Sequence, residues 1–226
     1  MVPVPRVLII YFSLSSQTRN LVLALGEGLA AQGVAVTRER LQPLRELRFP
    51  LGGLVETLAM MLLTFFRRRI PIQPPSPCCR EKYDLIVLAG PTWSYNPSGP
   101  VLSLLDSFGQ EIFAGRTVLP LISCRGYWRL HWWGLRGILR RLGATVPNLL
   151  VFSHPSPEPW RTIGVFFKLA GRLPEKMVLL RRHYRKYGHS RHQVEEARRF
   201  GEILGSVLQR NAELDSLDFR TALALP

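Results

Sequence analysis

The sequence contains few cysteines. Three occur among 226 residues, and two of them, Cys78 and Cys79, are adjacent. This number and spacing exclude a disulfide framework and favour a reducing, cytoplasmic compartment. A chain of this length is expected to form one domain, with a core large enough to need neither disulfides nor a structural metal.

Long hydrophobic runs are also missing. The most apolar helical stretch without a charge is 57–66, well short of the roughly 20 residues that a membrane span requires. The first residues lack a basic segment followed by an apolar stretch and a cleavage site, so no signal peptide is expected. Hydrophobic residues make up 46% of the chain and charged residues 20%, which excludes a disordered protein.

Acidic residues and lysine are scarce. There are 16 acidic and 30 basic residues, for a net charge of +14, and only four of the basic residues are lysine. The excess lies in the second half, since residues 121–226 carry +10 and residues 1–120 carry +4. An arginine-rich surface favours phosphate, carboxylate or anionic lipid as partners, although a general arginine bias gives the same composition. Nucleic acid is not expected, because no recognised nucleic-acid motif is present.

Apolar, β-branched segments alternate with helical ones along the chain. Five strands are predicted, over 6–12, 34–41, 83–90, 116–123 and 145–153, with Pro120 making the fourth irregular. Helices are predicted over 17–32, 98–108, 131–142 and 191–210. Strands separated by helices indicate βαβ units. We therefore expect an α/β domain over 1–210, a doubly wound five-stranded parallel sheet with helices on both faces, and a C-terminal tail over 211–226.

Two segments interrupt this alternation. The first insertion, 51–75, is apolar nearly all round and then carries three consecutive arginines at 67–69. The second, 155–189, holds Trp160 and a basic run at 181–186. With the tryptophans at 128, 132 and 133, these features suit an anionic lipid interface, where a quinone or another apolar acceptor would be a natural substrate. Alternatively, the apolar segment covers the sheet and the aromatic residues belong to the core.

The loops after the first, third and fourth strands are the places to seek a ligand, because ligands of open parallel sheets bind outside the carboxyl ends of the strands. The first loop, S-L-S-S-Q-T-R-N at 13–20, runs directly into a helix. Hydroxyl and backbone N–H groups at a helix N-terminus form a site for a phosphate, and Ser16 is suited to cap the helix. An ordinary polar turn is the alternative. The candidate residues here are Ser13, Ser15, Ser16, Gln17 and Thr18.

The other two loops carry aromatic residues. The third strand is followed by G-P-T-W-S-Y-N, whose Trp93 and Tyr95 offer flat faces to a flat ligand and whose Asn96 can bond its heteroatoms. The fourth strand is followed by S-C-R-G-Y-W, in which Gly126 permits close approach of the backbone and Arg125 adds positive charge. The alternatives are aromatic residues that cover the edge of the core and an arginine in a surface ion pair.

Together these motifs resemble the flavodoxin-like superfamily. The resemblance rests on Y-F-S-L-S-S-Q-T at 11–18, on D-L-I-V-L-A-G-P-T-W at 84–93 and on the loop after the fourth strand. It covers about residues 6–153 and the final helix. It implies that FMN is the cofactor, with its phosphate in the first loop and its ring between the other two. The implied phosphate residues are Ser13, Ser15, Gln17 and Thr18. The implied ring residues are Pro91, Thr92, Trp93, Ser94 and Tyr95 in one loop and Cys124, Arg125, Gly126 and Tyr127 in the other.

Three features depart from that family. The family's phosphate loop has the pattern S/T-x-S/T-G-x-S/T, and Ser16 stands where this pattern has glycine. The chain is basic, whereas electron-carrying flavodoxins are typically acidic, and the two insertions are foreign to short flavodoxins. The basic charge argues against a simple carrier that substitutes for ferredoxin.

The function expected from the sequence is that of an FMN-dependent oxidoreductase or electron-transfer protein. NAD(P)H or a reduced carrier would be the electron donor. A small molecule or protein, such as an apolar molecule at the inner membrane face, would be the electron acceptor. No catalytic acid–base residue is expected, because the flavin carries the redox chemistry. The alternative is a flavodoxin-like fold without flavin that serves as a membrane-surface or protein-interaction module. The oligomeric state stays open.

No metal site is expected. Histidines 183, 189 and 192 lie close together in a basic region, which favours solvated residues at a helix end over cation ligands. Cys78 and Cys79 have no partner nearby in the sequence with which to complete a ligand set.

Overall fold

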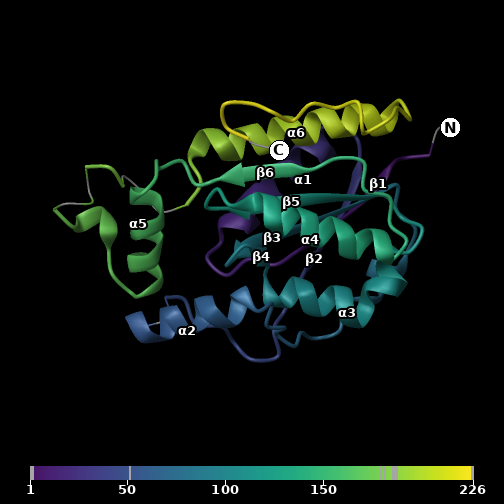
Figure 1. The fold of residues 1–226 in the computed structure, drawn as a ribbon. Coiled ribbons are helices and arrows are strands. Elements are labelled where there is room, and N and C mark those ends of the chain that lie inside the picture. Colours follow the sequence, from purple (N-terminus) through teal and green to yellow (C-terminus); the bar gives the residue numbers. More distant parts are fainter. Residues whose placement is uncertain (1–2, 51, 179, 181, 185–187, 225–226) are drawn as a thin grey trace.

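A parallel β-sheet forms the centre of the molecule (Figure 1). The computed structural model describes residues 3–50, 52–178, 180, 182–184 and 188–224. The strand order is β2-β1-β3-β5-β6, and every neighbouring pair on this path is parallel. The short β4 folds back antiparallel on β3. The predicted doubly wound five-stranded sheet is therefore confirmed. Its strands are β1 (Arg6–Tyr11), β2 (Ala35–Arg40), β3 (Leu85–Trp93), β4 (Asn96–Pro97), β5 (Val118–Cys124) and β6 (Leu150–Ser153).

The inner strands are apolar because both of their faces are buried. On β1, Val7 and Ile9 pack toward one helical layer, whereas Leu8 and Ile10 pack toward the other. A strand with two buried faces shows a continuous apolar run instead of an alternating one. This is why the runs at 6–12 and 83–90 identify strands so clearly.

One helical layer covers each face of the sheet. Helices α1 (Gln17–Ala31) and α6 (Arg191–Gln209) lie on one face, and α3 (Gly99–Phe113) and α4 (Trp128–Arg141) lie on the other (Figure 1). Helix α6 begins with a capping box, in which Ser190 Oγ accepts from Gln193 N (3.2 Å) and Gln193 Oε1 accepts from Ser190 N (3.0 Å).

Four predicted boundaries are wrong by three residues or more. Strand β3 ends at Trp93 and not at Gly90, because β4 pairs with its last two residues. Strand β6 starts only at Leu150, because Thr145 forms a single isolated bridge and Pro147 lacks the N–H that a ladder needs. Helix α3 ends at Phe113 and not at Phe108, and α4 begins at Trp128 and not at His131. In α3 the buried stripe continues to Ile112 and Phe113 beyond the polar pair at 110–111, whereas α4 gains an exposed first turn that includes Arg129 and Leu130.

Both insertions form helices at the end of the sheet to which the strands point. Helix α2 (Leu54–Phe65) precedes η1 (Pro77–Arg80), and α5 (Trp160–Leu169) precedes η2 (Pro174–Lys176). Figure 1 shows α2 and α5 together beyond the arrowhead of β6. Of the predicted basic run, residues 181, 185 and 186 lie outside the described residues, as do residue 51 and residues 225–226 of the tail. The described part of the chain contains no helix that is long and apolar enough to cross a membrane.

The C-terminal tail packs on the core. Leu214, Phe219 and Ala224 are buried against the layer of α1 and α6. The Asn148 side-chain amide donates to the carbonyls of Leu214 (3.0 Å) and Leu217 (2.7 Å), which fixes the path of the tail.

Candidate functional site

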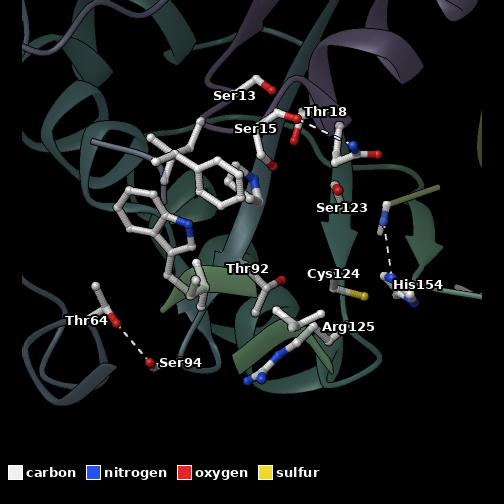
Figure 2. Close-up of a pocket in the computed structure, with 18 of the residues that line it drawn as sticks. Ser13, Ser15, Thr18, Thr64, Thr92, Ser94, Ser123, Cys124, Arg125 and His154 are labelled. Carbon is white, nitrogen blue, oxygen red and sulfur yellow. Dashed lines mark hydrogen bonds between the residues drawn. The ribbon is translucent and has the colours of Figure 1, made fainter. Parts of the chain in front are cut away.

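A cavity lies at the carboxyl ends of β1, β3 and β5, where all three predicted loops meet (Figure 2). Ten of the predicted site residues line it. They are Ser13, Ser15, Gln17, Thr18, Pro91, Thr92, Trp93, Ser94, Cys124 and Arg125. The other five, Ser16, Tyr95, Asn96, Gly126 and Tyr127, lie outside its lining. The fold thus brings together side chains that are separated by more than a hundred residues in the sequence.

The first loop leads into the N-terminus of α1 at the cavity. Ser13 Oγ accepts a hydrogen bond from Arg19 N (3.2 Å), and Thr18 is buried beside it. Figure 2 shows Ser13, Ser15 and Thr18 close together at the edge of the cavity. The first turn of a helix offers N–H groups without intrahelical partners, which favour an anion. This geometry suits a phosphate group.

Ser16 does not cap α1. It holds the N-cap position, but its side chain makes no capping hydrogen bond, so this expectation is wrong. The reason is its left-handed backbone, with φ 63° and ψ −2°, whereas a capping serine requires an extended conformation. Glycine tolerates this region without cost, which explains the glycine in the family pattern. The exposed Ser16 side chain does not narrow the cavity.

The two aromatic loops contact each other. Trp93 packs edge-on against Phe12, with ring centroids 5.6 Å apart. Tyr95 and Tyr127 come from different loops, and their ring centroids are 5.4 Å apart. Both tyrosines are exposed and lie outside the lining, so Trp93 is the aromatic residue of these loops that faces a ligand in the cavity.

Backbone strain is concentrated around this site. Five non-glycine residues in the described chain have a positive φ, and four of them, Ser16, Arg67, Ser94 and Tyr95, belong to the loops and helix end beside the cavity. Residues in this conformation cost free energy and persist where the surrounding structure requires them, which is common at functional sites. The strain supports a functional role for the cavity.

Asn96 is bonded to protein groups. Its amide nitrogen donates to the carbonyls of Thr64 (3.2 Å), Phe65 (3.0 Å) and Ser94 (3.1 Å), and its oxygen accepts from Arg67 Nε (2.9 Å). These bonds satisfy carbonyls at the C-terminal end of α2. Asn96 therefore joins the first insertion to the loop after β3.

The outer wall of the cavity comes from the two insertions. Met60, Met61 and Thr64 of α2 line one part of it, and Val165 and Leu169 of α5 line another. The Thr64 hydroxyl lies 2.8 Å from Ser94 Oγ, as the dashed line in Figure 2 shows. Sequence reasoning missed these residues, because nothing in an apolar helix indicates which of its residues face a cavity.

Two histidines add a further wall. His189 Nε2 lies 2.8 Å from Ser123 Oγ, and the His189 backbone N–H donates to Gln17 Oε1 (2.9 Å). His154 lines the same cavity. Burial lowers the pKa of each imidazole to about 4, so both are neutral at pH 7. The expectation of a solvated His189 is wrong, because the start of α6 carries this residue against β5.

The remaining histidines lie apart from the cavity lining. His131 Nδ1 is 2.8 Å from Thr92 Oγ1, and complete burial lowers its pKa to about 3. This bond fixes the side chain of Thr92 at the edge of the cavity. His183 stacks on Trp160 with centroids 4.5 Å apart, and His192 is exposed beside Glu195.

The loop after β5 is covered by the second insertion. Cys124 is buried, and desolvation raises the pKa of its thiol to about 12, so it is not a nucleophile at neutral pH. Gly126 has φ 138°, and a Cβ there would collide with the guanidinium of Arg161 on α5. Arg161 is held by Glu158 (3.0 Å). Arg125 is the cation of this loop that lines the cavity.

A separate group of possible metal ligands lies at η1. The ligand atoms of Glu39, Cys78 and Cys79 all lie within 4.8 Å of one another, and within the described ranges this is the single such group. The sequence showed no partner for the two cysteines, whereas the fold supplies a carboxylate from β2. Glu39 also accepts a hydrogen bond from Ser76 N (3.2 Å), and burial raises the pKa of Cys79 to about 12.

Comparison with known proteins gives matches in structure alone. No family model and no curated protein matches the sequence. A flavoprotein from Lactobacillus acidophilus, solved in complex with FMN, is similar over 65% of this chain and 93% of its own, with 18% identity and a TM-score of 0.50. A Bacteroides eggerthii protein described as a flavoprotein is similar over 64% of this chain and 87% of its own, with 16% identity and a TM-score of 0.52.

These likenesses concern the fold. If the five parallel strands are numbered along the chain without the short β4, the order β2-β1-β3-β5-β6 becomes 2-1-3-4-5. This is the order of flavodoxin-type doubly wound sheets. The expected resemblance is thus confirmed at the level of architecture: this chain has the flavodoxin-like fold.

Proposed function

We propose that the protein binds FMN in this cavity and works as a flavodoxin-like oxidoreductase or electron-transfer protein. One observation carries the proposal: a hydroxyl-rich loop at a helix N-terminus and the aromatic Trp93 open into the same cavity at the carboxyl edge of the sheet. The first feature suits a phosphate and the second a flat ring. The structurally similar flavoprotein from Lactobacillus acidophilus was solved with FMN, which supports the choice of ligand.

The residues present fit the group. Hydroxyls of Ser13, Ser15 and Thr18 and the first turn of α1 would hold the phosphate, and Trp93 would pack on the ring. When bound, the flavin supplies the electron or hydride transfer. Arg125 would stabilise negative charge on the ring, while the neutral His154 and His189 add no charge to the cavity.

The apolar outer wall supports a quinone or another apolar molecule as acceptor, reached near a membrane surface. Met60, Met61, Val165 and Leu169 line the side of the cavity opposite the sheet. Apolar walls bind apolar ligands through burial of surface. NAD(P)H or a reduced carrier is the proposed donor, and the charge of +14 argues against a role as a simple ferredoxin substitute.

The test is the visible absorption spectrum of the purified protein before and after incubation with FMN and desalting. Retained flavin absorption supports the proposal. A Ser15→Asp variant places a negative charge in the phosphate loop, so it should weaken binding of FMN and leave binding of riboflavin, which lacks the phosphate, unchanged. Equal loss of both ligands would contradict the assignment of this loop to the phosphate.

A second candidate function is a flavodoxin-like interaction module without flavin. The exposed apolar face of α2 favours it, because such a face marks a surface that binds a partner. A colourless protein that takes up no FMN would support this candidate and would reject the electron-transfer proposal.

A further inference from the structure

Helix α2 buries its polar face and exposes its apolar face, the reverse of the usual arrangement. Its two buried residues are Thr57 and Thr64, whose hydroxyls donate to the carbonyls of Gly53 (2.7 Å) and Met60 (2.9 Å). A helix on a water-soluble domain normally buries its apolar residues and exposes its polar ones. The exposed residues here are large and apolar, with exposed fractions of 41–76%: Leu54, Val55, Leu58, Leu62, Leu63, Phe65 and, at the C-cap, Phe66.

This arrangement is held in place by specific bonds. Asn96 binds carbonyls at the end of α2, and the hydroxyls of Thr64 and Ser94 lie 2.8 Å apart. Ser94 Oγ also donates to the Met61 carbonyl (2.8 Å). The helix therefore cannot turn its leucines inward without losing these bonds, and the apolar face is a fixed feature of the surface.

Arginines border the apolar face. Arg67, Arg68 and Arg69 follow α2 directly. Arg69 pairs with Asp106 (2.7 Å), whereas Arg67 and Arg68 take part in none of the ion pairs found in the described part of the chain. The helix itself carries one acidic residue, Glu56, near its opposite end. The border of the face is thus mainly cationic.

Exposed apolar side chains close to basic ones also occur in the segments on both sides of α2. Gly171, which follows α5, lies near Pro50, which precedes α2. The exposed Leu173, Met177 and Val178 come after Gly171, together with Arg172 and Lys176. On the other side, the Arg67 guanidinium lies close to Gly134 of α4, next to the exposed Trp133. Trp128 and Trp132 are partly buried and pack against the core instead. Exposed apolar surface of this extent marks an interaction site.

We propose that this surface, formed by α2, residues 171–178 and Trp133, binds an anionic lipid bilayer, with α2 lying in the plane of the interface. Apolar side chains bordered by arginine match the acyl boundary and the negative headgroups of such a bilayer. A second copy of the chain would bring an equally cationic border against the first, which like-charge repulsion opposes.

The proposal deepens the proposed function. Binding to the bilayer does not depend on that function, but what it implies for the electron acceptor rests on it. Helix α2 presents Met60 and Met61 to the cavity and its leucines and phenylalanines to the outside. A bilayer bound on the outer face would be separated from the cavity by the width of one helix. An apolar acceptor would then enter between α2 and α5 directly from the lipid phase.

The experiment is flotation of the purified protein with vesicles of phosphatidylcholine alone or mixed with phosphatidylglycerol, at low and high salt. We expect binding to the anionic vesicles that weakens as salt rises. A Leu58→Ser/Leu62→Ser variant should bind at least about tenfold more weakly, because the apolar surface that these leucines bury in lipid is lost. Both leucines are exposed, so the fold should survive. The matched control is Val4→Ser, an equally exposed apolar residue close to the N-terminus, and Figure 1 shows the N-terminus at the end of the molecule away from α2.

Charge is tested by Arg68→Glu, with Arg210→Glu after α6 as its control. Only Arg68→Glu should reduce binding to anionic vesicles. Absence of salt-sensitive flotation, or equal loss in the variants and their controls, would overturn the proposal. So would a dimer that the double leucine substitution dissociates, because a second copy would then occupy the face. Flavin retention measured on the same samples separates the two proposals, since flotation does not require FMN.

Discussion

The conformation of Ser16 leads to a prediction about stability. At φ 63° and ψ −2°, an L-residue costs roughly 1–2 kcal/mol relative to glycine. Glycine also gives the unfolded chain more freedom, which lowers stability by about 0.4–1 kcal/mol. The serine hydroxyl makes no capping bond that the substitution would remove. Ser16→Gly should therefore raise the free energy of unfolding by about 0.5–1 kcal/mol, or Tm by about 1–4 °C for a chain of this size.

The assay is urea and thermal unfolding of the wild type, Ser16→Gly and Ser16→Ala. Alanine keeps the Cβ and removes only the hydroxyl, so Ser16→Ala should leave stability unchanged within about 0.5 kcal/mol. A loss of about 1 kcal/mol in Ser16→Ala would show that serine caps α1 after all. A glycine variant no more stable than the wild type would refute the argument from backbone strain. Uptake of FMN should be unaffected in both variants, because Ser16 does not line the cavity.

Four further predictions concern other positions. Asn96→Ala should lower the free energy of unfolding by about 1–3 kcal/mol and expose α2 to proteolysis, because carbonyls at its end lose their donor. Gly201→Ala should lower the free energy of unfolding by at least about 1–3 kcal/mol in urea, since its Cβ would collide with the Leu25 carbonyl. Gly137→Ala on α4 should stabilise slightly, because its Cβ would meet only Arg141 Nη1, at 3.9 Å. The free energy of unfolding should fall as pH drops below about 6.5, by about 1.4 kcal/mol per pH unit for each buried histidine. The reason is that histidines of the unfolded chain take up protons there, whereas buried His131, with its pKa of about 3, does not. Urea unfolding at pH 7 and pH 5 should therefore show a smaller loss of stability in His131→Gln than in the wild type. Arg125→Ala should lower the midpoint potential of bound flavin in a redox titration, and an unchanged potential would reject its electrostatic role.

Much of the fold could be predicted because it is encoded locally. The buried strands of the sheet are continuous apolar runs, and α6 begins at a serine followed by glutamine at the third helical position. The three loops were identified by the rule that ligands bind at the carboxyl ends of parallel strands. Ten residues from them do line one cavity.

What the sequence by itself determined is the order of strands and helices, the class of sheet and the loops around the cavity, because periodicity and turn chemistry act between near neighbours. Only the tertiary structure decided which side of α2 faces inward, because a sequence pattern normally places threonines outside and leucines inside, whereas α2 buries Thr57 and Thr64 and exposes its leucines. It also placed His189 against Ser123 and Glu39 beside Cys78, pairs that are distant in the sequence. Such contacts depend on how whole elements pack, and no local pattern records them.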